Sequence, residues 1–340
     1  MEASMVSPPG HPARIITLMN QKGGVGKTTS TVSLGAAIAR LGRSTLLIDL
    51  DPQAHLTLHL GLDPVALDHT VYDLLVGPDA DRPHVDDVIQ PVGKHLDVLP
   101  AHVNLAGVES ELAPRMVTGT AQRVLMQALS QPGADGAAPV VERYEFILID
   151  CPPSLGLLTV NALTLANEVL VPLQAHFLAL QGLSQLLDTV TMIRQSFNPA
   201  LRVSGVLLCM HENQTLLAQE VIADLGRFLD AARDQDVPWR HAKVLEPPIR
   251  RNIKLAECPS FGQTVFDYAP TCHGARDYRK AAEDLIAHGP AEVAGVASDA
   301  TVTAEPASDD AAPVPTVEGA ADPDRLQPVA QGAAPGHGGH

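Results

Sequence analysis

The sequence predicts an α/β fold, a doubly wound and mostly parallel sheet with helices on both faces. Three observations predict it. Short apolar segments recur that are continuous rather than alternating, which is typical of strands buried on both faces. Helical patterns lie between these segments, as the connections of parallel strands require. Finally, residues 14–41 read as a strand, a glycine-rich loop and a helix start, in that order.

The elements follow from apolar runs and their boundaries. Strands are predicted at Arg14–Asn20, Ser44–Asp51, Leu96–Leu99, Phe146–Asp150, Glu168–Leu173 and Leu201–Met210. Helices are predicted at Ser30–Leu41, Ala121–Leu129, Gly182–Ser196, Leu216–Ala232 and Arg276–His288. Gly42 is a plausible end for the first helix, and Gln131–Pro139 reads as a loop.

Composition limits the size and type of the domain. The chain has 340 residues, enough for one large α/β domain or two small ones. Apolar residues make up 45% and aromatic residues 3%, so the core must be built from Leu, Val, Ile and Ala. The net charge of −16 argues against wholesale coating of nucleic acid but leaves room for a local basic patch.

The two ends differ from the rest of the chain. We expect residues 1–13 to be a short disordered lead and residues 14–288 to form the domain. Residues 289–340 are rich in Ala, Pro and Gly, with eight acidic residues and one arginine, a net charge of −7. We expect this segment to be a disordered tail, either inert or a linker for a partner.

Cysteine usage and hydropathy indicate the compartment. The four cysteines form no C-x-x-C pair, so metal-site spacing is absent, and Cys151 and Cys209 lie in apolar strands. This usage fits a reducing cytoplasm. Met1–His11 has no apolar core of signal-peptide length, and no apolar run reaches roughly 18 residues, so we expect no transmembrane span.

The glycine-rich loop Gln21–Thr29 predicts phosphate binding. Its glycines allow a tight turn that points backbone N–H groups at phosphate oxygens, and the following helix start adds partial positive charge. Lys27 would reach the β- and γ-phosphates, and the Thr28 hydroxyl would hold Mg²⁺. The loop departs from G-x-x-x-x-G-K-[ST], because Gln21 stands at the first glycine and a second lysine, Lys22, follows it. The alternative is a glycine-rich turn that binds nothing.

Three aspartates stand at predicted strand ends, which meet in one crevice in this type of sheet. Asp150 follows four apolar residues, the Walker B arrangement, and would hold Mg²⁺. Asp49 and Asp51 flank Leu50, so only one should face the nucleotide unless the chain bends at Pro52. The alternative is that these aspartates only cap the next turn.

Four motifs resemble those of the ParA/MinD family of deviant Walker ATPases, which are P-loop proteins. They are Lys22–Thr29 (KGGVGKTT), Asp49–Gln53 (DLDPQ), Asp150–Ser154 (DCPPS) and Leu255–Gly262 (LAECPSFG). The sequence is most similar to short, chromosomal-type (Soj-like) ParA partition ATPases, over about residues 14–288. The residues before the last motif, Arg251–Lys254, point to the partition branch.

The resemblance implies roles for individual residues. Lys22 would reach across a nucleotide-sandwich dimer to the partner's phosphates, so ATP would drive homodimerisation. Asp51 would orient or activate the attacking water, with Asp49 as the second candidate and as a further Mg²⁺ ligand. The implied ATP-binding residues are Lys22, Gly23, Gly24, Val25, Gly26, Lys27, Thr28 and Thr29, with Arg250 and Asn252 near the base.

The resemblance also implies DNA as a partner. Residues 239–280 carry eight basic and four acidic residues, a net of +4 in a chain of −16. Such a patch would bind phosphates without sequence preference, and a dimer would double it. The candidates are Arg240, Lys243, Arg251, Lys254, Arg279 and Lys280. The alternative is an ordinary solvated basic face.

The implied activity is slow ATP hydrolysis, stimulated by a ParB-like protein or a cargo adaptor, that times release from nucleoid DNA in the cytoplasm. A MinD-like membrane-cycling ATPase is the alternative, but it needs a basic amphipathic end and this tail is acidic. An iron–sulfur scaffold lacks the required cysteines, and a non-hydrolysing switch is disfavoured by Lys22, Lys27 and Asp51. Two positions depart from the family: His176 replaces a usual acid, and Gln214 a usual arginine.

Overall fold

The computed structural model describes residues 13–77, 82–133, 136–176, 179–212 and 216–288. The predicted tail 289–340, nearly all of the predicted lead, and Gln214 lie outside these residues.

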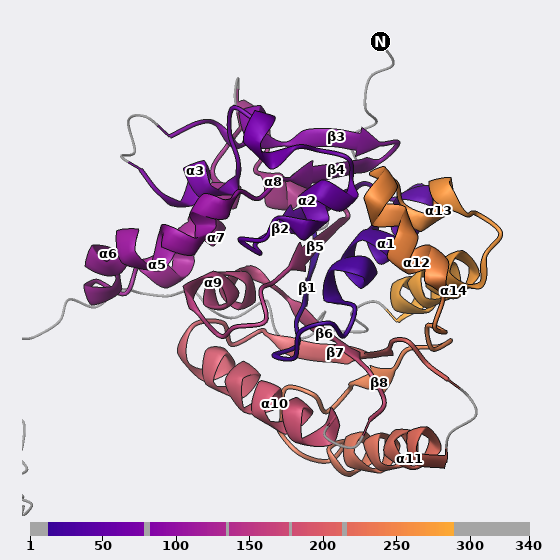
Figure 1. Ribbon diagram of the computed structural model, residues 1–340. Helices are drawn as coiled ribbons and strands as arrows, with labels where there is room; N and C mark the ends of the chain where they lie inside the picture. Colours follow the sequence, from indigo (N-terminus) through magenta and orange to yellow (C-terminus); the bar gives the residue numbers. More distant parts are fainter. Residues whose placement is uncertain (1–12, 78–81, 134–135, 177–178, 213–215, 289–340) are drawn as a thin grey trace, which may run out of the picture. The chain divides into compact units, whose positions relative to one another are not determined.

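Within the described residues, the strands form one eight-stranded sheet in the order β3-β4-β2-β5-β1-β6-β7-β8 (Figure 1). All neighbours pair in parallel except β3 and β4, which are antiparallel. The predicted doubly wound, mostly parallel α/β fold is therefore confirmed. The strands are β1 (Arg14–Leu18), β2 (Thr45–Asp49), β3 (Gln90–Gly93), β4 (Leu96–Leu99), β5 (Phe146–Asp150), β6 (Glu168–Leu173), β7 (Arg202–Leu208) and β8 (Lys243–Val244).

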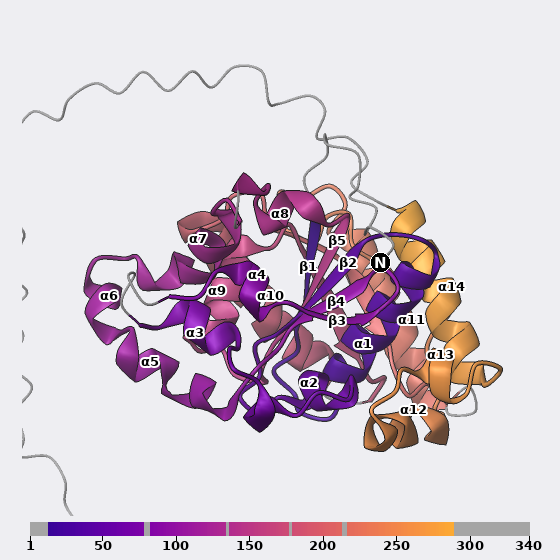
Figure 2. The same ribbon diagram turned by 90° about the horizontal axis from the view of Figure 1, so that it is seen from above.

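Helices cover both faces of the sheet (Figures 1 and 2). One face carries α1 (Lys27–Arg40), α2 (His55–His59), α12 (Ile253–Glu257), α13 (Val265–Tyr268) and α14 (His273–Ala287). The other carries α3 (Val71–Leu75), α4 (Val85–Val88), α5 (Val108–Glu111), α7 (Val124–Ser130), α9 (Leu157–Leu165), α10 (Ala179–Ser196) and α11 (Leu216–Ala231). The remaining helices are α6 (Ala113–Val117), α8 (Val140–Arg143) and the 3₁₀ turns η1 (Pro64–Ala66), η2 (Val103–Gly107), η3 (Ala121–Arg123) and η5 (Cys258–Phe261).

Two apolar cores result, one on each side of the sheet. Successive residues of a strand point to opposite faces, so Ile15 packs into the core with α9 and α10 while Ile16 packs into the core with α1 and α14. Both are buried. This is why the central strands read as continuous apolar runs.

The predicted boundaries differ from the structure in a few places. Helix α1 begins at Lys27 instead of Ser30, because Gly26 adopts a positive φ of 92° and the helix starts directly after it. The edge strands β3 and β8 were not predicted, since they span only four and two residues and lack a long apolar run.

Glu168 at the start of β6 forms a buried ionic cluster with two arginines. Its carboxylate accepts hydrogen bonds from Arg14 at 2.7 and 2.9 Å and from Arg202 at 2.9 Å. Arg14 also donates to the carbonyl oxygens of Leu285 and His288, so the cluster ties the start of β1 to the end of α14. Burial of Glu168 opposes ionisation, but the arginines outweigh this effect and hold its pKa below the usual value.

We expect Glu168→Gln to lower the free energy of unfolding by about 3–5 kcal/mol, because it leaves Arg14 buried without its counter-charge. Urea denaturation measures this loss. Because the pKa of Glu168 is depressed, its stabilising contribution is present at neutral pH and declines as the pH falls through that pKa. The control is Asp230→Asn, which removes an exposed ion pair with Arg233 and should cost about 0–1 kcal/mol. Equal losses in the two variants would contradict this assignment.

Candidate nucleotide-binding site

A cavity of about 970 Å³ opens at the carboxyl ends of the parallel strands. It lies between α12 and the glycine-rich loop Gln21–Thr29, the P-loop. The P-loop connects β1 to α1 in the middle of the sheet, beside the ends of β2 and β5 (Figure 1). Several predicted residues line the cavity together: Gly23, Gly24, Gly26, Lys27, Thr28, Thr29, Asp51, Arg250, Arg251 and Asn252.

The shape of the P-loop depends on two glycines. Gly24 and Gly26 have φ values of 73° and 92°, a region that other residues rarely adopt. A side chain at Gly24 would meet no atom within 4 Å, so the backbone conformation, not crowding, requires glycine there. The loop delivers Lys27 to the first position of α1, next to the helix N-terminus.

Lys27 is buried although its side chain is cationic. Its Nζ donates to the backbone oxygen of Lys22 at 3.2 Å, across the loop. Burial lowers its pKa, while the carboxylates of Asp150 and Asp51 act in the opposite direction. A desolvated ammonium inside a ring of backbone N–H groups is suited to phosphate oxygens, which would replace the lost hydration.

The side chains of Asp150 and Thr28 are hydrogen-bonded to each other. Thr28 Oγ1 donates to Asp150 Oδ2 at 2.6 Å, and Thr31 Oγ1 lies 3.4 Å from the other carboxylate oxygen. Burial, followed by the negative charge of Asp49, raises the pKa of Asp150 to about 8. The hydroxyl of Thr28 and the charge of Lys27 lower it only in part.

These residues fit Mg²⁺ bound together with a nucleotide. Mg²⁺ prefers hard oxygen ligands, and it usually binds one or two carboxylates plus phosphate oxygens and water. Burial, followed by the negative charge of Asp49, raises the pKa of Asp150, and a divalent cation would oppose both effects by favouring the carboxylate. Among the described residues, no group of three or more His, Cys, Asp or Glu side chains could hold a metal ion. Phosphate oxygens would therefore have to complete the coordination.

Asp49 is oriented differently from the sequence expectation. Its carboxylate is fully buried and accepts hydrogen bonds from Thr57 N and Oγ1 at 2.9 and 2.8 Å and from Asp51 N at 3.1 Å. Burial raises its pKa to about 6 despite these bonds. With its oxygens engaged by α2, Asp49 anchors the end of β2, and the geometry favours Asp150 and Thr28 over Asp49 as Mg²⁺ ligands.

Asp51 is the aspartate of this pair that lines the cavity. Strand β2 ends at Asp49, so the strict alternation that would point the two side chains in opposite directions no longer applies at Asp51. Its Oδ1 accepts from Gln53 N at 3.0 Å, which fixes the turn, and its side chain is half-exposed.

Apolar side chains line part of the cavity, and those that follow β7 or lie in α14 were not connected to the site by sequence reasoning. Cys209, Met210 and Tyr278 line it, together with Ile249, Ile253 and Leu255. Nothing in their local pattern marked them, because β7 and α14 are more than 150 residues from the P-loop. Arg250 and Asn252 lie here as predicted, but Arg250 pairs with the buried Asp277 at 2.9 Å and Asn252 caps α12 through Lys254 N.

Lys22 is exposed at the rim of the loop instead of inside the cavity. Its backbone N–H donates to Asn20 Oδ1, and its Nζ lies 2.6 Å from Nε2 of His176, in the connection after β6. The structure thus brings together two residues that the sequence singled out separately.

The predicted DNA-binding residues spread over β8, α12 and α14. Three of them are already in ion pairs: Lys243 with Asp284, Arg251 with Glu212 and Lys254 with Glu257, each at 2.8–2.9 Å. Arg279 lies over the ring of Phe266, and Arg240 and Lys280 are exposed. Arg251 also lines the nucleotide cavity, so it does not belong to a separate surface.

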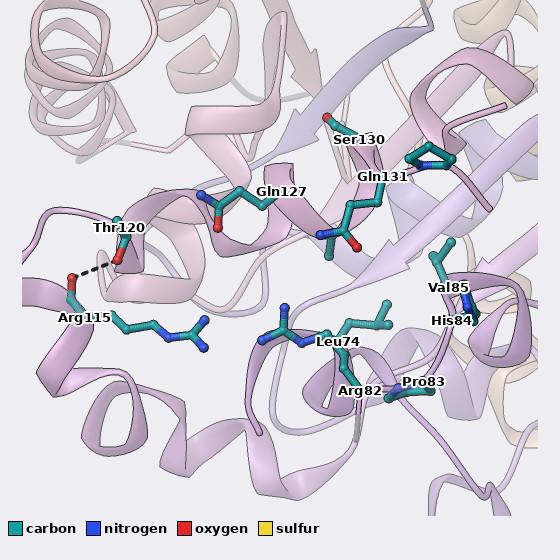
Figure 3. Close-up of a pocket in the computed structure, with 12 residues that line it drawn as sticks. Leu74, Arg82, Pro83, His84, Val85, Arg115, Thr120, Gln127, Ser130 and Gln131 are labelled. Atoms are coloured by element: carbon teal, nitrogen blue, oxygen red, sulfur yellow. Dashed lines mark hydrogen bonds between the residues drawn. The ribbon is translucent and has the colours of Figure 1, made fainter. Parts of the chain in front are cut away.

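A second cavity, of about 870 Å³, lies between α3, α6 and α7 (Figure 3). Arg115 and Arg82 extend into it from opposite sides, with Gln127 and Gln131 beside them (Figure 3). No lining residue named for it also lines the nucleotide cavity. It is therefore a separate cavity from the nucleotide site.

Comparisons with known proteins identify the family. A family profile described as "AAA domain" matches residues 13–203. The sporulation initiation inhibitor protein Soj of Bacillus subtilis is 41% identical over 277 residues, which covers 81% of this chain and 99% of Soj. The chain belongs to the ParA/MinD family. The chromosome partitioning protein ParA of Caulobacter vibrioides is also 41% identical, over 81% of this chain and 95% of that protein.

A solved structure supports the family's nucleotide chemistry. Cobyrinic acid a,c-diamide synthase from Mycobacterium smegmatis, with a bound ATP analogue and magnesium, has a TM-score of 0.64 and 34% identity. The match covers 81% of this chain and 95% of the synthase. The chromosome-partitioning ATPase Soj of Treponema pallidum is 40% identical over 81% of this chain and 97% of that protein. The predicted class of ATP hydrolase and the predicted cofactors, ATP and Mg²⁺, are therefore confirmed at the level of the family. No helix among the described residues has the length and apolarity to cross a membrane.

We expect Thr28→Ala to weaken Mg²⁺-dependent ATP binding by about 10- to 100-fold, because it removes the hydroxyl that Asp150 orients. Titration calorimetry with Mg²⁺ and with EDTA measures the difference. Thr28→Ser keeps the hydroxyl and should stay close to the wild type. If Thr28→Ala loses no more affinity with Mg²⁺ than with EDTA, the hydroxyl is no part of the metal site.

Proposed function

We propose that this protein is a partition ATPase whose residues 14–288 bind ATP with Mg²⁺, dimerise, and hold DNA until hydrolysis releases it. The observation that carries the proposal is the pair of lysines in the P-loop. Lys27 is buried inside the loop, whereas Lys22 is exposed at its rim. Since Lys27 occupies the inside of the loop, Lys22 at the rim would serve the nucleotide of a second protomer.

Each residue of the site would have a separate role. The backbone of Gly23–Thr29 and the ammonium of Lys27 would bind the phosphates, and Thr28 and Asp150 would hold Mg²⁺. When bound, Mg²⁺ would neutralise charge on the β- and γ-phosphates. Asp51, at the open side of the cavity, would orient the attacking water. Lys22 of the partner subunit would add positive charge where the transferred phosphoryl group becomes more negative.

Dimerisation would also exclude water from the site. Lys22 is solvated in the single protomer, where its charge is screened and of little catalytic value. Closing two protomers over the nucleotides would lower the local dielectric constant and strengthen each lysine–phosphate contact. This accounts for the slow turnover that we expect of an isolated protomer.

Partitioning is supported by the names of the relatives at 41% identity, a chromosome partitioning protein among them. We further propose that the protein binds DNA without sequence preference and that a ParB-like protein or a cargo adaptor stimulates its hydrolysis. We expect a cytoplasmic, nucleoid-associated location. Helix α14 carries three exposed basic residues at positions i, i+3 and i+4, which share one face of the helix: Arg276, Arg279 and Lys280. A row of cations on one face suits contacts with phosphates. The synthase likeness at 34% identity is weaker and supports the ATP site only.

The residues that the structure describes, 13–288 with short gaps, offer no support for the membrane-cycling alternative. That activity needs an amphipathic helix with a free apolar face. The last described helix, α14, buries its apolar residues Tyr278, Ala281 and Leu285 against α1 and neighbouring core residues. It therefore has no free apolar face for a membrane.

We expect Lys22→Ala to abolish ATP-dependent dimerisation while leaving one protomer able to bind ATP. Sedimentation velocity with ATP and Mg²⁺ measures the dimer. The matched variant is Asp51→Ala, which changes the charge of the same site but should still dimerise. Its stimulated ATP turnover should fall by about 10²-fold or more, since it loses the group that orients water.

Normal dimers of Lys22→Ala would disprove the cross-dimer role. Unchanged turnover of Asp51→Ala would disprove the assignment of Asp51 without affecting that of Lys22.

We expect Lys280→Ala to weaken binding to DNA of any sequence and to reduce the slope of log K against log salt by about 1, the loss of one phosphate contact. Fluorescence anisotropy over a salt series measures both. Lys280 suits this test better than Arg251, because Arg251 lines the nucleotide cavity and would also affect ATP. The control is Lys94→Ala, an exposed lysine between β3 and β4 at the other edge of the sheet. Equal effects of the two variants would place the DNA surface elsewhere.

A further inference from the structure

The ammonium of Lys22 is held by a histidine of the same protomer. Its Nζ lies 2.6 Å from His176 Nε2, at the start of the connection between β6 and α10. An ammonium has only donor hydrogens, so the ring nitrogen must accept. The contact therefore requires a neutral His176 ring with its proton on Nδ1.

The main chain around Lys22 is fixed separately from its side chain. Lys22 N donates to Asn20 Oδ1 at 2.9 Å, and Asn20 Nδ2 donates to the carbonyl oxygen of Pro172 at 2.8 Å. Lys27 Nζ donates to the carbonyl oxygen of Lys22. Moving the Lys22 ammonium therefore does not require the loop to rearrange, but it does require the contact with His176 to break.

We propose that His176 is a positioning residue that keeps Lys22 on its own protomer, and that protonation of the His176 ring frees Lys22 for a partner's nucleotide. This inference rests on the proposed function, since it concerns the lysine that would cross the dimer. His176 and the nucleotide of the partner protomer would compete for contact with the Lys22 ammonium.

Protonation would end the contact for two reasons. An imidazolium donates from both nitrogens and has no lone pair for Lys22. It also places a second positive charge beside the ammonium. Because imidazole can gain a second proton, pH is the variable that tests this competition.

The structure connects three charged side chains to the loop that carries Lys22: Lys27, Asp51 and Asp150. The P-loop contributes Lys22 itself and Lys27, and the ends of β2 and β5 contribute Asp51 and Asp150, whose charges act on Lys27. In the connection 174–179, His176 is the only titratable residue of the sequence. A carboxylate at this position would instead hold Lys22 by an ion pair.

The test compares ATP-dependent dimerisation of the full chain at pH 6 and pH 8. Sedimentation with a non-hydrolysable ATP analogue and Mg²⁺ gives the dimer dissociation constant. The wild type should dimerise about two- to tenfold more tightly at pH 6 than at pH 8, the effect of removing one competing hydrogen bond. His176→Gln offers an amide oxygen that does not titrate, so it should match the wild type at pH 8 and lose this difference. His176→Ala should dimerise tightly at both values.

His241→Gln, which replaces an exposed histidine, is the control and should keep the wild-type pH difference. The same pH difference in His176→Gln as in the wild type, or unchanged dimerisation of His176→Ala at pH 8, would overturn the inference. Lys22→Ala separates this result from the proposed function. If Lys22→Ala is monomeric while the His176 variants have no effect, only the inference about His176 fails; if Lys22→Ala dimerises, the proposed function fails.

Discussion

The constraint on which the site depends is the burial of like charges at neighbouring strand ends. Asp49 and Asp150 are fully buried and directly opposite each other in the β2–β5 register. Thr57 stabilises the first and Thr28 the second through short hydrogen bonds, and Lys27 supplies the nearest buried cation. Burial, followed by the charge of Asp49, raises the pKa of Asp150 to about 8, and a further positive charge would lower it. The edge of the sheet is thus built to receive a cation together with an anionic ligand.

The rest of the fold keeps these strand ends in register. Each central strand is covered on both faces, so Ile147 and Leu148 of β5 enter different cores. A strand buried in this way cannot slip by one residue without exchanging its two faces, which fixes the position of Asp150. At the opposite end of the sheet, Arg14 and Glu168 join β1 to β6 through a buried ion pair. The P-loop therefore extends from strands that are held at both ends.

Much of this could be predicted from the sequence, because the decisive features are local. The P-loop glycines need positive φ angles, and the central strands are continuous apolar runs that end in aspartate. The orientation of Asp49 could not be predicted, since it depends on Thr57 folding back from α2. The contact of Lys22 with His176 joins residues 154 positions apart and leaves no local pattern. The same is true of the ion pairs that occupy part of the predicted basic surface, such as Lys243 with Asp284.

The hydrogen bonds from Arg14 to the carbonyl oxygens of Leu285 and His288 have a practical consequence for engineering. They fasten the last described residues to the beginning of β1, whereas the nucleotide cavity opens where the parallel strands end. A fluorescent protein or affinity tag joined after His288 would therefore attach at the opposite end of the strands from the P-loop. The position directly after His288 is accordingly the preferred insertion point for a label that must leave the ATP-dependent face open.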